Sequence, residues 1–352
     1  MRIDLTENWE LTGSYPGFWA FGRSMEVGVQ LKGIVPWIPA EVPGSVHWDL
    51  HRSGYLPDPY YGANALACEW VNQRDWLYRT FFAAEESWRG KKVTLLLEGV
   101  DYSAKVLLNG KEIGRHTGMF IPGEFDLSES LRYGENNALL VVLERSPDGV
   151  AQLGYTDQVN HLKSRFGYKW DFCPKLVHIG LWKGVSLKIS EWIRFDNVRI
   201  EAVPGADGNG EAAVSAAVES GQSGRFRLTA ELYEPGGQLA GEASYEGDAV
   251  PGLQTIRQRI SVPHVRLWWP NGYGEQPLYR LKLRLEVADS EGGYCRSDDH
   301  EACIGFRTLS FRANPGAPSD ALAFTVEVNG EPIYIKGWNW VPADQLYGRH
   351  RE

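Results

Sequence analysis

The sequence predicts an all-β protein that contains two consecutive β-sandwiches. Glycine (39) and proline (19) are numerous and spread along the 352 residues, as many short strands joined by tight turns require. Many short stretches alternate between apolar and polar side chains, which is typical of strands with one buried face. Aromatic residues make up 12% of the chain and include 14 tryptophans, whose rings suit the wide space between two packed sheets.

The overall charge excludes some classes of function. The chain has 36 basic and 45 acidic side chains and a net charge of −9, so non-specific binding to nucleic acid or anionic membranes is not expected. No apolar run approaches the ~20 residues that span a bilayer. Acidic residues occupy the N-terminal stretch where a signal peptide is apolar, and the four cysteines have no zinc-like spacing. We therefore expect a reduced, soluble, cytoplasmic protein without a cofactor.

Residues 1–190 are predicted to form the first sandwich. The clearest local signal is Asn109-Gly110, a hairpin turn that joins a strand over 103–108 to a returning strand over 111–114. Apolar runs at 92–98 and 137–143 indicate two buried strands. One short helix is expected near residues 45–50, where Ser45 is in position to cap it.

Residues 191–312 are predicted to form a smaller antiparallel sandwich. Two stretches, 225–233 and 279–287, alternate with a period of two and present one apolar and one charged face. The motif Gly208-x-Gly210-x-x-Ala213 resembles a dinucleotide-binding loop, but alternating residues follow it, so we interpret it as a hairpin turn.

Residues 313–352 contain a last hairpin, 324–328 and 333–337, around Asn329-Gly330. The apolar segment 338–344 then has no obvious partner in the sequence, so we expect the polypeptide to be cut short.

No metal site is expected. His47 and His51 lie four residues apart, which places them on one face of a helix, but no third ligand is evident.

Two aromatic clusters could contact sugars. In residues 164–174, aromatic rings flank Asp171, and a sugar pocket needs ring faces beside a carboxylate that accepts hydrogen bonds from adjacent hydroxyls. A packed aromatic turn capped by the aspartate is an equally good interpretation. For residues 268–279 we favour a rigid turn that leads into a strand, with its indoles wedged between domains.

In order along the chain, these segments resemble glycoside hydrolase family 2, specifically its β-mannosidase branch. Individual matches include Trp269-Pro270-Asn271-Gly272 and Gly337-Trp338-Asn339-Trp340. Nine segments carry the resemblance: 42–50, 56–60, 75–79, 97–102, 116–120, 179–182, 269–279, 304–307 and 336–344.

The resemblance implies a jelly-roll, galactose-binding-like sandwich over 1–190 and an immunoglobulin-like sandwich over 191–312. Residues 313–352 would then be a hairpin stub that leads toward a TIM barrel, with the first strand of that (β/α)8 barrel ending at Asn339-Trp340. The rest of the barrel would be missing. In this family the catalytic glutamate pair belongs to the barrel, and the acid follows an asparagine. The chain contains no Asn-Glu dipeptide, so no catalytic residue is assigned and no hydrolysis by this chain alone is expected.

The resemblance also implies a set of substrate-binding residues. The family's Trp-Asp-Trp-Gly-Pro loop matches 170–174, so Asp171 would hold sugar hydroxyls and Trp170 would support it. Phe172 and Cys173 replace the loop's second Trp and Gly, so sugar specificity can differ from that of other members. Asn339, Trp340 and Asp344 would lie at the mouth of the barrel, where such barrels place their active sites.

The leading hypothesis is therefore the N-terminal, non-catalytic portion of a β-mannosidase-like retaining hydrolase that acts on terminal β-linked mannose. The alternatives are a stand-alone carbohydrate-binding module, a remnant without a ligand, or a related branch such as β-galactosidase, β-glucuronidase or exo-glucosaminidase. The expected partners are a carbohydrate and the missing barrel domain. Self-association is also expected through the exposed C-terminal stub, which includes Trp338 and Trp340.

Overall fold

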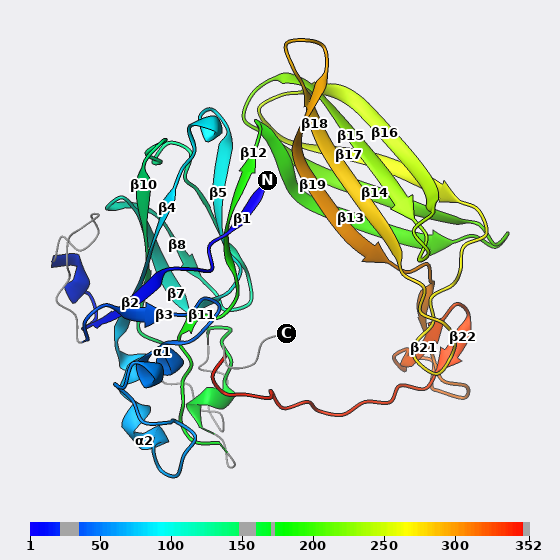
Figure 1. Ribbon diagram of the computed structural model, residues 1–352. Helices are drawn as coiled ribbons and strands as arrows, with labels where there is room; N and C mark the ends of the chain where they lie inside the picture. The colour runs from blue at the N-terminus through cyan, green and yellow to red at the C-terminus, as the bar shows by residue number, and fades with distance from the viewer. Residues whose placement is uncertain (22–34, 148–159, 170–172, 348–352) are drawn as a thin grey trace. The chain divides into compact units, whose positions relative to one another are not determined.

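The computed structural model describes residues 1–21, 35–147, 160–169 and 173–347, and it confirms the all-β fold class (Figure 1). The chain divides into two compact units. The first unit contains Met1–Ile189 together with Val341–Glu352, and the second contains Ser190–Trp340. The predicted stub over 313–352 is therefore not a unit of its own, because its hairpin belongs to the second unit and its last residues to the first.

The first unit is a sandwich of two main sheets. The smaller sheet has the spatial order β1 (Arg2–Asp4), β12 (Val185–Ser190), β5 (Lys92–Leu97) and β9 (Gly123–Asp126). The larger sheet has the order β3 (Ile38–Ala40), β2 (Trp9–Ser14), β4 (Asp75–Ala83), β10 (Asn136–Leu143), β7 (Ser103–Leu108) and β8 (Lys111–Thr117), and its neighbouring strands are antiparallel. A short pair, β6 (Val100–Asp101) with β11 (Gly180–Leu181), forms a separate two-stranded sheet.

Short helical segments complete the first unit. They are the α-helices α1 (Val46–Arg52) and α2 (Ala65–Cys68) and the 3₁₀ turns Phe18–Phe21, Val71–Gln73, Glu86–Trp88 and Phe166–Tyr168. No helix in the described ranges is long and apolar enough to span a lipid bilayer.

The apolar runs predicted from the sequence form the core of the first unit. Strand β10 is central in its sheet, and its residues from Asn137 to Leu143 are all buried. Side chains alternate between the faces of a strand, and both faces of β10 are covered: Leu139, Val141 and Leu143 belong to the main core, and Leu140 and Val142 to a second cluster with Trp19 and Leu77. Trp76 and Tyr78 of β4 are also fully buried, so these rings fill the space between the sheets.

The local turn predictions for the first unit are confirmed, with one difference at a helix cap. Asn109 and Gly110 have φ angles of 51° and 85°, and positive φ at both positions matches the right-handed twist of the hairpin β7–β8. Ser45 stands at the N-cap of α1, but its hydroxyl makes no capping hydrogen bond and is buried without a hydrogen-bond partner in the structure.

The second unit is a sandwich of a three-stranded and a four-stranded sheet. The three-stranded sheet contains β13 (Ile193–Pro204), β14 (Gly210–Ser220) and β17 (Gly252–Val262), in this order. The other contains β16 (Leu239–Ala249), β15 (Gly224–Tyr233), β18 (Tyr279–Ala288) and β19 (Tyr294–Ile304). Burial alternates along β15 and β18 as predicted, and residues 205–209 form the hairpin turn between β13 and β14.

A third small sheet contains β20 (Leu309–Arg312), β21 (Thr325–Val328) and β22 (Glu331–Ile333). It confirms the predicted turn at Asn329-Gly330 and the strand before it, whereas the returning strand is Glu331–Ile333 and does not extend over 334–337. The barrel strand expected to end at Asn339-Trp340 is not formed, since residues 334–347 contain no strand. A parallel barrel strand needs hydrogen-bonding neighbours on both sides, and this segment has none among the described strands.

Candidate functional site

The structure describes three of the five predicted site residues. Trp170 and Asp171 lie outside the described residues. Asn339 and Trp340 belong to the second unit, and both are exposed, with 77% of Trp340 accessible. Asp344 belongs to the first unit and is half-buried there.

Residues Asp344–Tyr347 return to the first unit and dock on it. The hydroxyl of Tyr60 donates a hydrogen bond to the Asp344 carboxylate and accepts one from the Leu346 backbone N–H at 3.1 Å. The Leu346 side chain is fully buried in the core of the first unit. This segment is therefore an integral part of the first unit.

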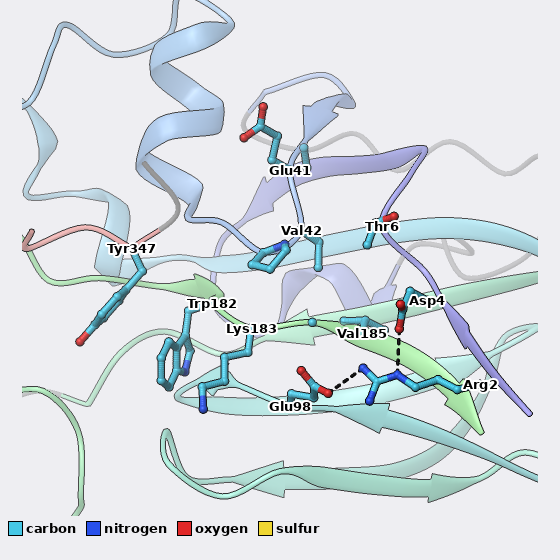
Figure 2. A pocket seen from close by; sticks show the side chains of 13 residues that line it. Arg2, Asp4, Thr6, Glu41, Val42, Glu98, Trp182, Lys183, Val185 and Tyr347 are labelled. Atoms are coloured by element: carbon cyan, nitrogen blue, oxygen red, sulfur yellow. Dashed lines mark hydrogen bonds and ion pairs between the residues drawn. The ribbon is translucent and has the colours of Figure 1, made fainter. Parts of the chain in front are cut away.

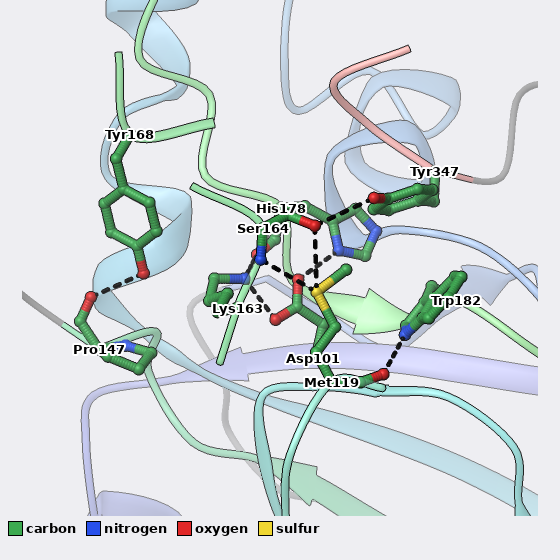
Figure 3. A network of polar contacts seen from close by, with 9 residues as sticks. All are labelled: Asp101, Met119, Pro147, Lys163, Ser164, Tyr168, His178, Trp182 and Tyr347. Atoms are coloured by element: carbon green, nitrogen blue, oxygen red, sulfur yellow. Dashed lines mark hydrogen bonds and ion pairs between the residues drawn. The ribbon is translucent and has the colours of Figure 1, made fainter. Parts of the chain in front are cut away.

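Tyr347 ends the docked segment in an aromatic and polar contact (Figure 3). Its ring lies edge-on to His178, with centroids 4.9 Å apart, and tilted against Trp182 at 5.0 Å. The hydroxyl groups of Tyr347 and Ser164 are 3.1 Å apart and share a hydrogen bond. Burial raises the pKa of the Tyr347 phenol, so it stays protonated and can donate this bond.

Beneath Tyr347 lies a buried cluster of three charged or titratable side chains, Asp101, Lys163 and His178 (Figure 3). The Lys163 ammonium donates to the Asp101 carboxylate and, at 2.7 Å, to the carbonyl oxygen of His178. The His178 Nδ1 is 2.7 Å from the other Asp101 oxygen. Asp101 ends β6, and His178 comes just before β11, so the pairing of these two short strands brings both residues together.

The three side chains are only 0%, 1% and 3% exposed for Asp101, Lys163 and His178, which governs their ionisation. Burial alone would raise the pKa of Asp101, but Lys163 and His178 together hold it below its ordinary value. Burial lowers the pKa of His178, and this effect is larger than the opposite effect of the Asp101 carboxylate. At neutral pH the ring is therefore uncharged. An ionised carboxylate can only accept, so His178 donates from Nδ1.

This cluster is suited to holding the backbone in place rather than to acid–base catalysis. No substrate reaches side chains this deeply buried, and an ionised, ion-paired carboxylate has no proton to donate. Lys163 instead fixes the segment 160–169. The neighbouring Ser164 contacts the Met119 sulfur with both its backbone N–H and its hydroxyl, each at 3.4 Å.

No sequence motif predicted this cluster. A signal exists for His178, which interrupts the apolar run 176–181, and for Asp101, which follows directly on buried Val100. Nothing local marks Lys163, because its partner is 62 residues away in the chain.

Beside the docked segment, the first unit has a cleft of about 920 Å³ (Figure 2). Trp182 and Tyr347 line one part of it. The guanidinium of Arg2 lines another part, bonded to Asp4 at 2.9 Å and to Glu98 at 2.7 Å. The cleft therefore combines aromatic ring faces with charges that are largely paired with each other, and the whole lining belongs to the first unit.

The two histidines considered as metal ligands have separate roles. His47 is fully buried, and its Nδ1 has no hydrogen-bond partner in the structure, whereas the His51 ring nitrogen lies 3.1 Å from the Leu56 carbonyl. In the described ranges, no three His, Cys, Asp or Glu side chains are grouped to hold a metal ion.

The tryptophan-rich segment 268–279 is the turn that the sequence predicted. The Trp269 N–H donates to the Glu275 carbonyl at 2.9 Å, and Tyr273 N–H to the Pro270 carbonyl at 3.0 Å, and the chain then enters β18. The Arg307 guanidinium stacks on the Trp268 ring.

Comparison with known families gives two matches that follow the boundaries of the two sandwiches. Residues 19–183 match the glycosyl hydrolase 2 galactose-binding domain-like family, and residues 193–307 match glycosyl hydrolases family 2, together well over half of the chain. The chain belongs to glycoside hydrolase family 2. The predicted family is thereby confirmed, and the described residues contain no (β/α)8 barrel.

Curated relatives of this chain include β-mannosidases. The chain is 30% identical to β-mannosidase B of Thermothelomyces thermophilus over 323 residues, which is 88% of this chain and 36% of that protein. It is also 30% identical to the β-mannosidase of Mus musculus, over 88% of this chain and 37% of that protein. The chain thus spans little more than a third of the length of these relatives.

A solved structure has the same fold. The β-D-mannosidase of Dictyoglomus thermophilum superposes over the whole of this chain with a TM-score of 0.81 and 28% identity, and the match covers 41% of that protein. A Bacteroides uniformis β-glucuronidase shares the fold alone, at 17% identity and a TM-score of 0.67.

Proposed function

We propose that this chain is the N-terminal, non-catalytic portion of a β-mannosidase-like retaining glycoside hydrolase, and that its first unit supplies one wall of the substrate pocket. The observation that carries this proposal is the similarity to β-mannosidases over 88% of the chain, combined with the smaller share of their length that it spans. The whole enzyme would cleave a terminal β-linked mannose. Its two catalytic carboxylates, ~5 Å apart in a retaining enzyme, would come from a further domain.

In this proposal Asp171, supported by Trp170, holds hydroxyls of the terminal sugar, and no metal or cofactor takes part. Asn339, Trp340 and Asp344 contribute at the mouth of the barrel. The docking of Asp344–Tyr347 supports this arrangement. Gln345 bonds to Pro174 and Tyr347 bonds to Ser164, so this C-terminal segment lies close to described residues on both sides of 170–172. The cytoplasmic location stays a prediction.

The first test is sugar binding by the chain itself. We expect methyl β-D-mannopyranoside to bind at millimolar concentration or weaker, because one wall covers only part of a sugar. Asp171→Ala should abolish this binding, measured by NMR titration. Asp207→Ala, an exposed aspartate of the second unit, is the matched control and should bind like the original chain.

Two outcomes would decide against this assignment. Turnover of an aryl β-mannoside by the purified chain would contradict a non-catalytic portion. Tight binding that is lost with Asp171→Ala would instead favour a stand-alone carbohydrate-binding module.

A second test concerns the exposed apolar side chains of residues 322–341. Trp338 and Trp340 are 80% and 77% exposed, and Phe324, Tyr334 and Ile335 are exposed as well. Such a stretch favours association, so we expect analytical ultracentrifugation to show oligomers that increase with concentration. The double substitution Trp338→Ser and Trp340→Ser should shift the population toward monomer. A monomer at every concentration in the unaltered chain would contradict this expectation.

A further inference from the structure

The cleft of about 920 Å³ on the first unit has no part in the proposed function (Figure 2). Every residue that lines it is described by the structure, and its lining includes none of residues 170–172. Its volume lies in the range of ~300–1,000 Å³ that is typical of small-molecule sites. Trp182 and Tyr347 stand at one end and Arg2 at the other, so a ligand that contacts both ends has to be an extended one.

The aromatic end of the cleft is fixed before any ligand arrives. The Trp182 indole N–H donates to the Met119 carbonyl oxygen at 3.1 Å. The same ring lies edge-on to Phe120, with centroids 6.4 Å apart, and its centroid is 5.0 Å from that of Tyr347. A ring with these contacts loses little further freedom when an apolar C–H surface packs on it.

The other end of the cleft holds polar groups in a fixed arrangement. Arg2 donates from Nε to Asp4 Oδ1 at 2.9 Å and from a terminal nitrogen to Glu98 Oε1 at 2.7 Å. In the described ranges, neither Asp4 Oδ2 nor Glu98 Oε2 takes part in a hydrogen bond. The Asp4 and Glu98 side chains are 61% and 32% exposed, so these two oxygens can accept hydrogen bonds from the hydroxyls of a ligand.

The charges of the cleft favour a neutral ligand. Arg2 lies between two carboxylates, so its charge is balanced and attracts an anion only weakly. Lys183 is exposed, and its ammonium lies 4.8 Å from the centroid of the Trp182 ring. This contact is weak at an exposed site and leaves the ammonium able to turn toward a hydroxyl. Sugars combine hydroxyls with apolar C–H faces, which match the two ends of the cleft.

We propose that this cleft binds a neutral oligosaccharide of at least two sugar units. The rings of Trp182 and Tyr347 cover its C–H faces, and the carboxylates of Asp4 and Glu98 accept hydrogen bonds from its hydroxyls. The inference goes beyond the proposed function, since it adds a second sugar site that does not use Asp171. It rests on the proposed function only for the identity of the sugar, which is taken as β-linked mannose.

The probe is β-1,4-mannobiose, a neutral disaccharide, and the starting protein is the full chain with Asp171→Ala. This substitution removes the sugar site of the proposed function, so binding that remains belongs elsewhere on the chain. We expect ligand-observed NMR to show binding in the millimolar range, because an open cleft covers only part of the disaccharide. Methyl β-D-mannopyranoside reaches only one end of the cleft and should show no binding to this protein.

Two further substitutions locate the binding in the cleft. Trp182→Ala removes the ring and should weaken mannobiose binding about ten-fold. Glu98→Gln should weaken it about five-fold, because a neutral amide oxygen is a weaker acceptor than a carboxylate. Glu98→Gln keeps the shape of the side chain, so it decides the matter if thermal unfolding shows that Trp182→Ala has lost its fold.

The second unit offers a matched control for each substitution. Trp268 is half-buried, with the Arg307 guanidinium 4.9 Å from its ring. Glu219 is 39% exposed and bonds to Arg194 at 2.8 Å. Trp268→Ala and Glu219→Gln should both leave mannobiose binding unchanged.

Two results would overturn the proposal. One is the absence of mannobiose binding to the Asp171→Ala chain. The other is equal affinity in Trp182→Ala, Glu98→Gln and the two controls, because the sugar would then bind outside the cleft. The proposed function has a separate outcome, since it depends on whether Asp171→Ala loses the binding of methyl β-D-mannopyranoside that the unaltered chain shows.

Discussion

Replacing Lys163 with methionine is expected to lower the free energy of unfolding of the first unit by about 3–5 kcal/mol, the usual result of removing one partner from a buried ion pair. Methionine keeps most of the length of the side chain but leaves the Asp101 carboxylate buried with only His178 as a neutral partner. It also leaves the His178 carbonyl without its donor. Differential scanning calorimetry should show that only the transition of the first unit moves.

A lysine in an exposed ion pair is the matched control. Lys92 lies 2.8 Å from Asp126 in the same unit, but the two side chains are 31% and 50% exposed. Lys92→Met should therefore cost about 1 kcal/mol or less. Equal losses in the two methionine variants would show that the buried cluster contributes no more than a surface pair.

A double substitution distinguishes the lost attraction from the charge left behind. Asp101→Asn together with Lys163→Met removes both charges, and the asparagine oxygen can still accept from His178 Nδ1. We expect the double variant to lose less stability than Lys163→Met alone, because no unpaired buried charge remains. A loss equal to the sum of the two single losses would contradict this explanation.

The sequence predicted the features whose cause is local. The hairpins at Asn109-Gly110 and Asn329-Gly330 formed because these residue pairs adopt the positive φ angles that the turns need. The alternating strands of the second unit formed with the predicted buried faces, since a period of two assigns each side chain to one face.

The features that were missed depend on partners far away in the chain. Lys163 and its partner Asp101 are 62 residues apart in the chain, and Tyr347 and its partner Ser164 are 183 residues apart. No local sequence pattern therefore predicts either contact. The strand expected at Asn339-Trp340 failed for a related reason, because its formation depends on neighbouring strands that the described residues do not provide. The residues predicted with most weight, Trp170 and Asp171, lie outside the described residues and remain predictions.

The second large effect concerns pH and two buried groups on helix α1. Burial, with the nearby His178 and Lys163 acting in the same direction, lowers the pKa of His47 from 6.5 to about 3. Between about pH 3 and 6.5 the His47 ring is therefore protonated in the unfolded chain but not in the folded chain. His47 therefore contributes stability that is full above pH 6.5 and is lost as the pH falls toward 3, at up to ~1.4 kcal/mol per pH unit.

Asp49, two residues later, acts in the opposite direction. Burial raises its pKa from 3.8 to about 7, although the hydrogen bonds from the Glu41 N–H and the Arg52 side chain act to lower it. Here the folded chain holds a proton that the unfolded chain releases, so stability is lost as the pH rises from 3.8 to about 7. Between about pH 4 and 6.5 the opposite pH dependences of His47 and Asp49 cancel, so the stability of the unaltered protein shows neither of them.

Single substitutions should expose the two slopes. Relative to the unaltered chain, His47→Gln should gain stability as the pH is lowered from 6.5 to 4, and Asp49→Asn should gain stability as the pH is raised over the same range, by up to about 3 kcal/mol each. Urea unfolding at several pH values measures both differences. His51→Gln, on the same helix but partly exposed, provides the control for His47→Gln. If the relative stabilities of the His47 and Asp49 variants stay constant from pH 4 to 6.5, the burial of these groups does not control their ionisation as argued.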